Sequence, residues 1–247
     1  MEAYTSFAQV YDMFMDNVSY EQWTDFIYEQ LHKHGIIEGK ILDLGCGTGK
    51  ITRLLSKKGY DLVGVDSSIE MLEVAANRND SDIMYLHQNI IDMDLYSDFK
   101  AAYSTCNCLN YILEETDLYN VFQSVYEHLE NKGLFIFDLN TEYKYKEILQ
   151  DNTYAENRED GSFIWDNYYD EESGVNEYQL ALFIKEKENL YRKFEEVHFQ
   201  KAYSLELIKK LLETNGFTIL EIKDEYSNED AMEDSEIVTF VAQKDCH

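Results

Sequence analysis

Three glycines spaced two residues apart follow a short apolar segment in the first fifth of the chain. The segment Lys40–Leu44 leads into Gly45, Gly47 and Gly49, and a helical pattern comes directly after them. Glycines after a buried strand allow a tight turn and a close approach of the backbone to a ligand, and the helix that follows presents free N–H groups. We therefore expect a parallel sheet with a ligand site at the carboxyl end of its strands.

The rest of the chain alternates between strand-like and helix-like patterns. We predict further strands over 61–65, 83–86, 101–106, 134–139, 217–223 and 236–243, and helices from Ser67 or Ser68 to Arg78, over 115–130 and over 205–215. Alternation at this spacing is typical of βαβ units, which form a parallel sheet with helices on both faces. The chain is therefore predicted to be an α/β protein.

Two regions depart from this alternation. Residues 4–34 have apolar side chains at the spacing of two amphipathic helices. Residues 151–201 contain strand-like segments over 163–169, Val175–Lys187 and 190–203, which suggest a small antiparallel sheet. We predict one α/β domain formed by 1–150 and 202–247, interrupted by a β insertion over 151–201.

Charge and composition exclude several classes of partner. The formal net charge is −28, and no segment is basic, so neither nucleic acid nor an anionic membrane is an expected partner. The chain has no apolar run of membrane-spanning length and no signal-peptide pattern, and its four cysteines lack the spacing of a disulfide framework. We expect a cytoplasmic protein in which Cys106 and Cys108 are core thiols, and no metal site.

Asp66 ends the strand after the glycine segment, where a carboxylate can accept hydrogen bonds from both hydroxyls of a ribose. A dinucleotide fingerprint would require a third glycine at position 50, which is Lys50. The segment 41–49, Ile-Leu-Asp-Leu-Gly-Cys-Gly-Thr-Gly, instead resembles motif I of the class I S-adenosylmethionine-dependent methyltransferases, and 63–68 and 129–135 extend the likeness. The resemblance covers 36–140 closely and 204–243 loosely.

The resemblance implies a Rossmann-like seven-stranded mixed sheet, an N-terminal helical lid and a small antiparallel β insertion. It also implies S-adenosylmethionine as cofactor, with the glycines along its methionine half, Asp43 ordering the loop and the amino group, and Asp66 on the ribose. The cofactor-binding residues expected from matching positions are Asp43, Gly45, Cys46, Gly47, Gly49, Asp66, Ser67, Met71, Asn89, Ile90, Thr105 and, in the lid, Tyr11.

The segment 107–111, Asn-Cys-Leu-Asn-Tyr, resembles a bacterial subgroup of this family, most of whose members have no assigned substrate. We expect a small-molecule acceptor methylated on N or O. The candidate positioning or base groups are Tyr111, Asn110, His198 and Glu196, the last two lying two residues apart on one face of a predicted strand. Trp165, Tyr169 and Arg192 of the insertion are expected to bind the acceptor.

The absence of proline excludes two other branches, because the Asp/Asn-Pro-Pro-Tyr motif of amino methyltransferases and the Pro-Cys motif of cytosine C5 enzymes cannot be present. Other hypotheses stay open at this point. The protein could methylate protein or RNA, could bind S-adenosylmethionine or S-adenosylhomocysteine without catalysis, or could be a nicotinamide-dependent oxidoreductase. The oligomeric state is not determined by the sequence.

Overall fold

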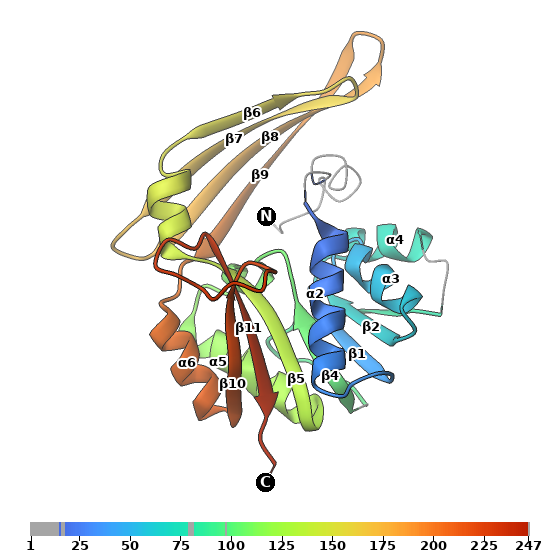
Figure 1. Cartoon of the computed structure of the whole chain (residues 1–247). Helices are drawn as coiled ribbons and strands as arrows, with labels where there is room; N and C mark the ends of the chain where they lie inside the picture. The colour runs from blue at the N-terminus through green and yellow to red at the C-terminus, as the bar shows by residue number, and fades with distance from the viewer. Residues whose placement is uncertain (1–14, 16–17, 79–81, 97, 247) are drawn as a thin grey trace.

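A computed structural model describes residues 15, 18–78, 82–96 and 98–246 of the chain (Figure 1). Its helical elements are α2 (Tyr20–Lys33), α3 (Lys50–Lys57), α4 (Ile69–Asn77), η1 (Cys108–Tyr111), α5 (Glu115–His128), η2 (Lys144–Leu149) and α6 (Leu205–Thr214). Its strands are β1 (Lys40–Leu44), β2 (Asp61–Asp66), β3 (Met84–His87), β4 (Phe99–Ser104), β5 (Leu129–Asn140), β6 (Thr153–Asn157), β7 (Gly161–Asp170), β8 (Val175–Lys187), β9 (Leu190–Lys201), β10 (Phe217–Asp224) and β11 (Ile237–Lys244).

The main sheet has seven strands in the order β10-β11-β5-β4-β1-β2-β3. The pairs among β5, β4, β1, β2 and β3 are parallel, whereas β11 runs antiparallel to both of its neighbours. This arrangement confirms the predicted Rossmann-like seven-stranded mixed sheet. The carboxyl ends of β1, β2, β4 and β5 meet at one edge of the sheet, where ligands bind in folds of this kind.

Helices cover both faces of this sheet. On one face, Leu118 and Phe122 of α5 and Ile208 of α6 pack against the central strands in one apolar cluster. On the other face, Ile27 and Leu31 of α2 belong to a second cluster together with α3. Successive side chains of a strand point to opposite faces of the sheet, and the central strands contribute apolar side chains to both clusters. Strands that are apolar on both faces are typical of a parallel sheet buried between two helical layers.

The insertion forms a separate four-stranded antiparallel sheet, in the order β6-β7-β8-β9, that lies over the strand-end edge of the main sheet (Figure 1). Strand β6 was not predicted. In β6 only Tyr154 and Glu156 are half-buried, and the strand has no continuous apolar run that would distinguish it from a loop. The insertion is thus confirmed as antiparallel, with one more strand than the sequence indicated.

The junction between α5 and β5 also differs from the prediction. The helix ends at His128 and the strand begins at Leu129, whereas the apolar pattern suggested a helix to residue 130 and a strand from residue 134. Leu129 is buried and pairs with Phe99 of β4, so packing extends the chain before the apolar run begins. Lys132 then adopts a positive φ of 63°, which sequence periodicity does not reveal.

The first of the two predicted N-terminal helices lies outside the described residues, whereas the second is present as α2. Within the described part of the chain, no helix has the length and apolar character needed to cross a membrane.

Candidate active site

The glycine segment joins β1 to α3, and each of its glycines has a positive φ. A Cβ at Gly45 would lie 2.2 Å from the Cys108 Sγ, and one at Gly49 would lie 2.3 Å from the Tyr85 hydroxyl. A Cβ at Gly47 would meet nothing within 4 Å. Gly45 and Gly49 are therefore required by internal packing, while Gly47 borders open space at the strand ends.

Asp66 is the last residue of β2 and is held by two backbone donors. The Gly47 N–H donates to its Oδ2 at 2.8 Å, and the Ser68 N–H donates to its Oδ1 at 2.8 Å. Burial raises the pKa of this carboxyl group, and the two hydrogen bonds oppose that shift by favouring the charged form. Each oxygen retains acceptor capacity, so a fixed carboxylate is available to a pair of hydroxyl groups.

Asp43 is almost fully buried beneath the glycine segment, with 2% of its surface exposed. The hydroxyls of Thr52 and Tyr103 both donate to its Oδ2 at 2.6 Å. Its Oδ1 has no hydrogen-bond partner among the described residues. Burial raises the pKa of Asp43 to about 7 despite the two donors. A buried carboxylate oxygen without a donor is matched by a cationic group such as an ammonium.

Gly45, Gly47 and Asp66 border a cleft of about 390 Å³. Its lining contains most of the cofactor-binding residues that were predicted, namely Gly45, Gly47, Asp66, Ser67, Met71, Asn89, Ile90 and Thr105. Asp43 and Cys46 line a small adjoining recess with Thr105. Asn89 Oδ1 accepts the Ile91 N–H at 3.0 Å, so part of its acceptor capacity is already used.

Two predicted cofactor residues are found neither in the described lining of the cleft nor in that of the recess. Gly49 lies at the start of α3 against Tyr85, so its glycine is needed for packing and for its φ of 71°. Tyr11 lies outside the described residues. The cleft also includes residues that we did not predict to contact the cofactor: Ser68, Glu70, Ile91, Cys108 and Ile112. In the sequence, Ser68 and Glu70 are recognisable only as residues at the start of a predicted helix, and not as residues of a ligand site.

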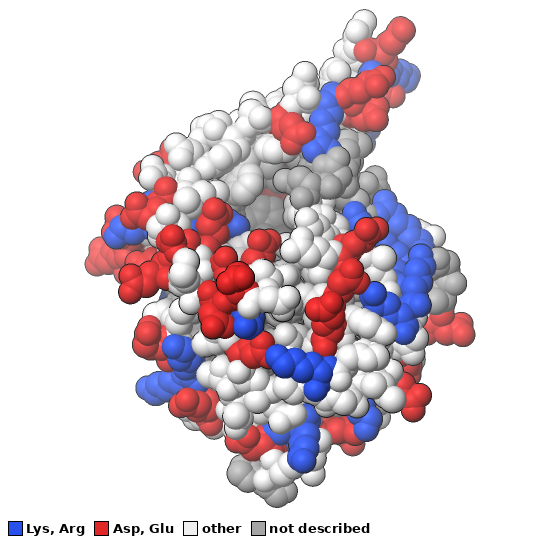
Figure 2. Space-filling model, viewed as in Figure 1, with Lys and Arg blue, Asp and Glu red and all other residues white. Residues whose placement is uncertain are grey.

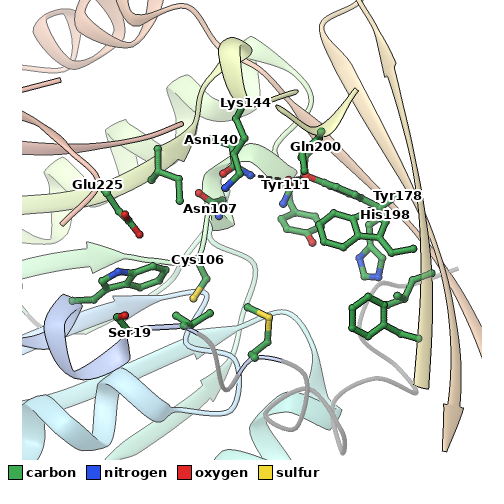
Figure 3. A pocket seen from close by; sticks show the side chains of 18 of the residues that line it. Ser19, Cys106, Asn107, Tyr111, Asn140, Lys144, Tyr178, His198, Gln200 and Glu225 are labelled. Carbon is green, nitrogen blue, oxygen red and sulfur yellow. Dashed lines mark hydrogen bonds between the residues drawn. The ribbon is translucent and has the colours of Figure 1, made fainter. Parts of the chain in front are cut away.

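A second cavity, of about 440 Å³, lies between the insertion sheet and the ends of the central strands (Figure 3). The insertion contributes Phe163, Trp165, Tyr178, Leu180, Leu182, His198 and Gln200, and the main domain contributes residues that include Trp23, Asn107, Asn140, Lys144 and Glu225. Cys106 and Tyr111 line both this cavity and the cofactor cleft. The two spaces therefore share a wall at the end of β4.

His198 and Glu196 lie on the inner face of β9, as the two-residue spacing predicted. The His198 Nε2 is 3.0 Å from the Glu196 Oε2, and both side chains are about 95% buried (4–5% exposed). The ring of Tyr111 lies edge-on to the His198 ring, with 5.9 Å between their centroids. His198 thus lies beside the shared wall, with the Glu196 carboxylate next to its Nε2.

Three predicted acceptor or catalytic residues are placed elsewhere. Asn110 is fully buried, and its Nδ2 donates to the carbonyls of Asn140 and Lys201, so its amide joins strand ends and does not line the cavity. Tyr169 stacks on Tyr145 behind the cavity wall, with ring centroids 5.8 Å apart. Arg192 lies near the β8–β9 turn, exposed and paired with a nearby carboxylate. The sequence does not fix the register of the β8–β9 hairpin, and the observed register places Arg192 beyond the cavity.

The cavity has a polar end that the sequence analysis missed. Gln200 Oε1 accepts hydrogen bonds from the hydroxyls of Tyr145 at 2.8 Å and Tyr178 at 2.7 Å, and from Asn140 Nδ2 at 3.3 Å. Gln200 is two residues beyond His198 on the same strand face, so strand periodicity could have identified it. Tyr178 is the register partner of His198 on β8, which only the pairing reveals.

The residues of the cleft fit S-adenosylmethionine. Asp66 would accept the ribose hydroxyls, the Oδ1 of Asp43, which has no partner among the described residues, would match the ammonium group, and the space at Gly47 would admit the ligand against the backbone. Met71 and Ile90 would supply an apolar surface for the adenine. Together, the strand order and this set of hydrogen-bond donors and acceptors define a protein with the class I methyltransferase fold and a site for a nucleoside cofactor.

Comparison with known proteins identifies the family. Residues 41–133 match the family described as "Methyltransferase domain". A protein of Geobacillus sp. (strain WCH70), provisionally named a methyltransferase, is 36% identical over 245 residues, covering 98% of this chain and 99% of the relative. The chain belongs to the S-adenosylmethionine-dependent methyltransferases.

Solved structures agree with this assignment. An S-adenosylmethionine-dependent methyltransferase from Clostridium acetobutylicum is 29% identical and has a TM-score of 0.90, with 99% of this chain and 100% of that chain covered. CalS10 of Micromonospora echinaspora, an amino pentose methyltransferase solved with S-adenosylmethionine bound, shares the fold at 14% identity, with a TM-score of 0.75 and 99% of each chain covered.

Proposed function

We propose that this methyltransferase transfers the methyl group to a nitrogen or oxygen atom of a small molecule bound in the 440 Å³ cavity. The observation that carries the proposal is the wall formed by Cys106 and Tyr111, which borders both that cavity and the cofactor cleft. Methyl transfer is an in-line displacement, so donor and acceptor must lie in adjoining spaces. The volume is in the range of small-molecule sites in proteins.

The side chains around the shared wall suggest how the acceptor is activated. S-adenosylmethionine, when bound, supplies a methyl group on a sulfonium, which is already an activated leaving group. The protein must then align the acceptor and remove a proton where the nucleophile carries one. We assign proton acceptance to His198, oriented by Glu196 at 3.0 Å, and alignment to Tyr111.

The lining favours an acceptor with an apolar face and a polar end. Phe163, Trp165, Leu180 and Leu182 form an apolar wall on the insertion sheet. Asn140 and Lys144 of the main domain and Gln200 of β9 supply amide and charged groups at the polar end, where all three are labelled in Figure 3. CalS10, whose fold this chain shares, acts on a small molecule, which agrees with this choice.

Charge argues against a polymeric acceptor. Asp and Glu side chains are spread over the face seen in Figure 2, with Lys and Arg interspersed among them, and the formal net charge is −28. A polyanion such as RNA would be repelled by this surface. The reactive end of a macromolecule would also have to enter a cavity between the insertion sheet and the strand ends of the main domain. Methylation of protein or RNA is therefore the weaker alternative.

The proposal is tested by incubating the enzyme with methyl-labelled S-adenosylmethionine and separate metabolite, protein and RNA fractions of a bacterial extract. We expect label in the metabolite fraction, and label only in protein or RNA would contradict the proposal. With the acceptor identified, His198→Gln and Trp165→Ala should lower turnover or raise the acceptor KM, with S-adenosylhomocysteine affinity within about twofold. Tyr168→Ala is the matched control, because Tyr168 is on the outer face of the same strand and is 49% exposed.

A non-catalytic binding module would bind S-adenosylhomocysteine equally well but would transfer no label to any fraction. Turnover therefore separates the enzyme from the module.

A further inference from the structure

Two successive residues other than glycine adopt left-handed backbone conformations directly after β4. Cys106 has a φ of 59° and Asn107 a φ of 57°. Asparagine tolerates this region better than most residues, but cysteine does not, and such residues persist only where the surroundings hold them. Some group in the structure must therefore stabilise this turn.

That group is the carboxylate of Asp138 on the neighbouring strand β5. Ser104 pairs with Phe137, so Asp138 lies one residue further along, level with the turn. The Asn107 N–H donates to the Asp138 Oδ1 at 2.8 Å, and the Cys106 amide also stabilises the charged carboxylate. Asp138 is completely buried, beside Tyr226, and burial raises its pKa to about 7.

The turn lies where its shape matters for the reaction. Cys106 borders both the cofactor cleft and the acceptor cavity, Thr105 before it lines the cleft, and Asn107 after it lines the cavity. A change of backbone conformation at Cys106 would therefore move the shared wall. Asp138 itself does not line either space among the described residues.

We propose that Asp138 is a positioning residue, which holds the Cys106–Asn107 turn in its left-handed conformation and so shapes the end of the cleft that receives the methionine half of the cofactor. It acts through the two backbone amides and does not touch the substrate. The inference concerns cofactor binding alone, so it stands or falls independently of the acceptor and of the proposed role of His198.

The test uses S-adenosylhomocysteine as the probe and calorimetry as the readout. Asp138→Ala should weaken its affinity at least about tenfold. Glycine adopts positive φ without a steric cost, so Asn107→Gly should rescue the defect, leaving less than about a threefold loss between Asn107→Gly and the double variant. If Asp138→Ala costs the same in both backgrounds, or nothing in either, the carboxylate does not act through the turn.

A second pair of variants leaves the buried carboxylate intact, in case Asp138→Ala does not fold. Asn107→Ala and Asn107→Gly remove the same side-chain amide and differ in the cost of the left-handed backbone. We expect Asn107→Ala to bind S-adenosylhomocysteine several-fold more weakly than Asn107→Gly. Equal affinities in two folded variants would overturn the proposal. Thermal unfolding of each variant establishes that the fold is retained.

Discussion

Replacing Asp43 by asparagine should make the cofactor-free protein more stable, and the gain should grow as the pH rises. Asp43 is 2% exposed, and its pKa is raised from 3.8 to about 7, chiefly by burial. The folded protein therefore binds this proton more tightly than the unfolded chain does. Stability from the group is present below the unfolded pKa and is lost as the pH rises through the folded pKa. Asparagine keeps an oxygen for Thr52 and Tyr103 and has no charge to bury.

The size of the effect follows from these two pKa values. One pKa unit corresponds to about 1.4 kcal/mol, so the ionisation of Asp43 costs roughly 2 kcal/mol at about pH 5.5 and roughly 4 kcal/mol at about pH 8. The advantage of Asp43→Asn over the natural protein should therefore increase by about 2 kcal/mol between these pH values. The absolute advantage also depends on how the new amide is accommodated, but that contribution is nearly independent of pH.

Urea unfolding of both proteins at the two pH values measures this difference. Asp61→Asn is the control, because Asp61 is an exposed carboxylate at the start of β2 and the substitution removes the same charge from a solvated position. An advantage that is the same at both pH values would refute the argument that the buried carboxylate is charged at a cost. The same variant should bind S-adenosylhomocysteine more weakly, since the oxygen that matches the ammonium group is lost.

Three further predictions concern ligand binding. Asp66→Ala should weaken S-adenosylhomocysteine binding at least about tenfold by calorimetry, because a hydrogen bond to a charged group contributes roughly 1.5–3 kcal/mol, and unchanged affinity would contradict the assigned ribose site. Gly47→Val should abolish binding, and Gly45→Val should lower the unfolding temperature more than Gly47→Val does, because both positions have a positive φ but only a Cβ at Gly45 would lie 2.2 Å from the Cys108 Sγ. Gel-shift assays at about 0.15 M salt should detect no binding of tRNA or duplex DNA, and a salt-sensitive shift would favour an RNA acceptor.

Much of the cofactor cleft could be predicted because its signals are local. Gly45 and Gly47 follow a strand, Asp66 ends the next one, and Ser68 caps α4 by accepting the Met71 N–H at 3.2 Å. Parallel strands bring such ends to one edge whatever their sequence separation. Packing also gives a reason for a glycine that the local pattern assigns to the ligand. Gly49, which looked like a ligand residue, is needed for its contact with Tyr85.

The acceptor cavity was less predictable, because its walls come from segments far apart in the chain. Alternation along β9 correctly placed His198 and Glu196 on one face. It could not show that Tyr178 lies opposite His198, or that Arg192 lies beyond the cavity, since both depend on the β8–β9 register. Asn110 has the residue type of a catalytic group, but its amide joins the ends of β5 and β9 in the interior.

The sequence by itself determined the class of protein. The hydrophobic periodicity, the spacing of the glycines and the acidic residue at a strand end are properties of short segments, and they can be recognised without knowing which distant residues are in contact. Only the tertiary structure decided how the two spaces meet. The left-handed turn at Cys106, the burial of the Asp43 carboxylate and the burial of the Asp138 carboxylate each result from packing between strands that are about 30 to 60 residues apart. Burial and pairing of this kind depend on which groups the fold places together, and no local pattern encodes them.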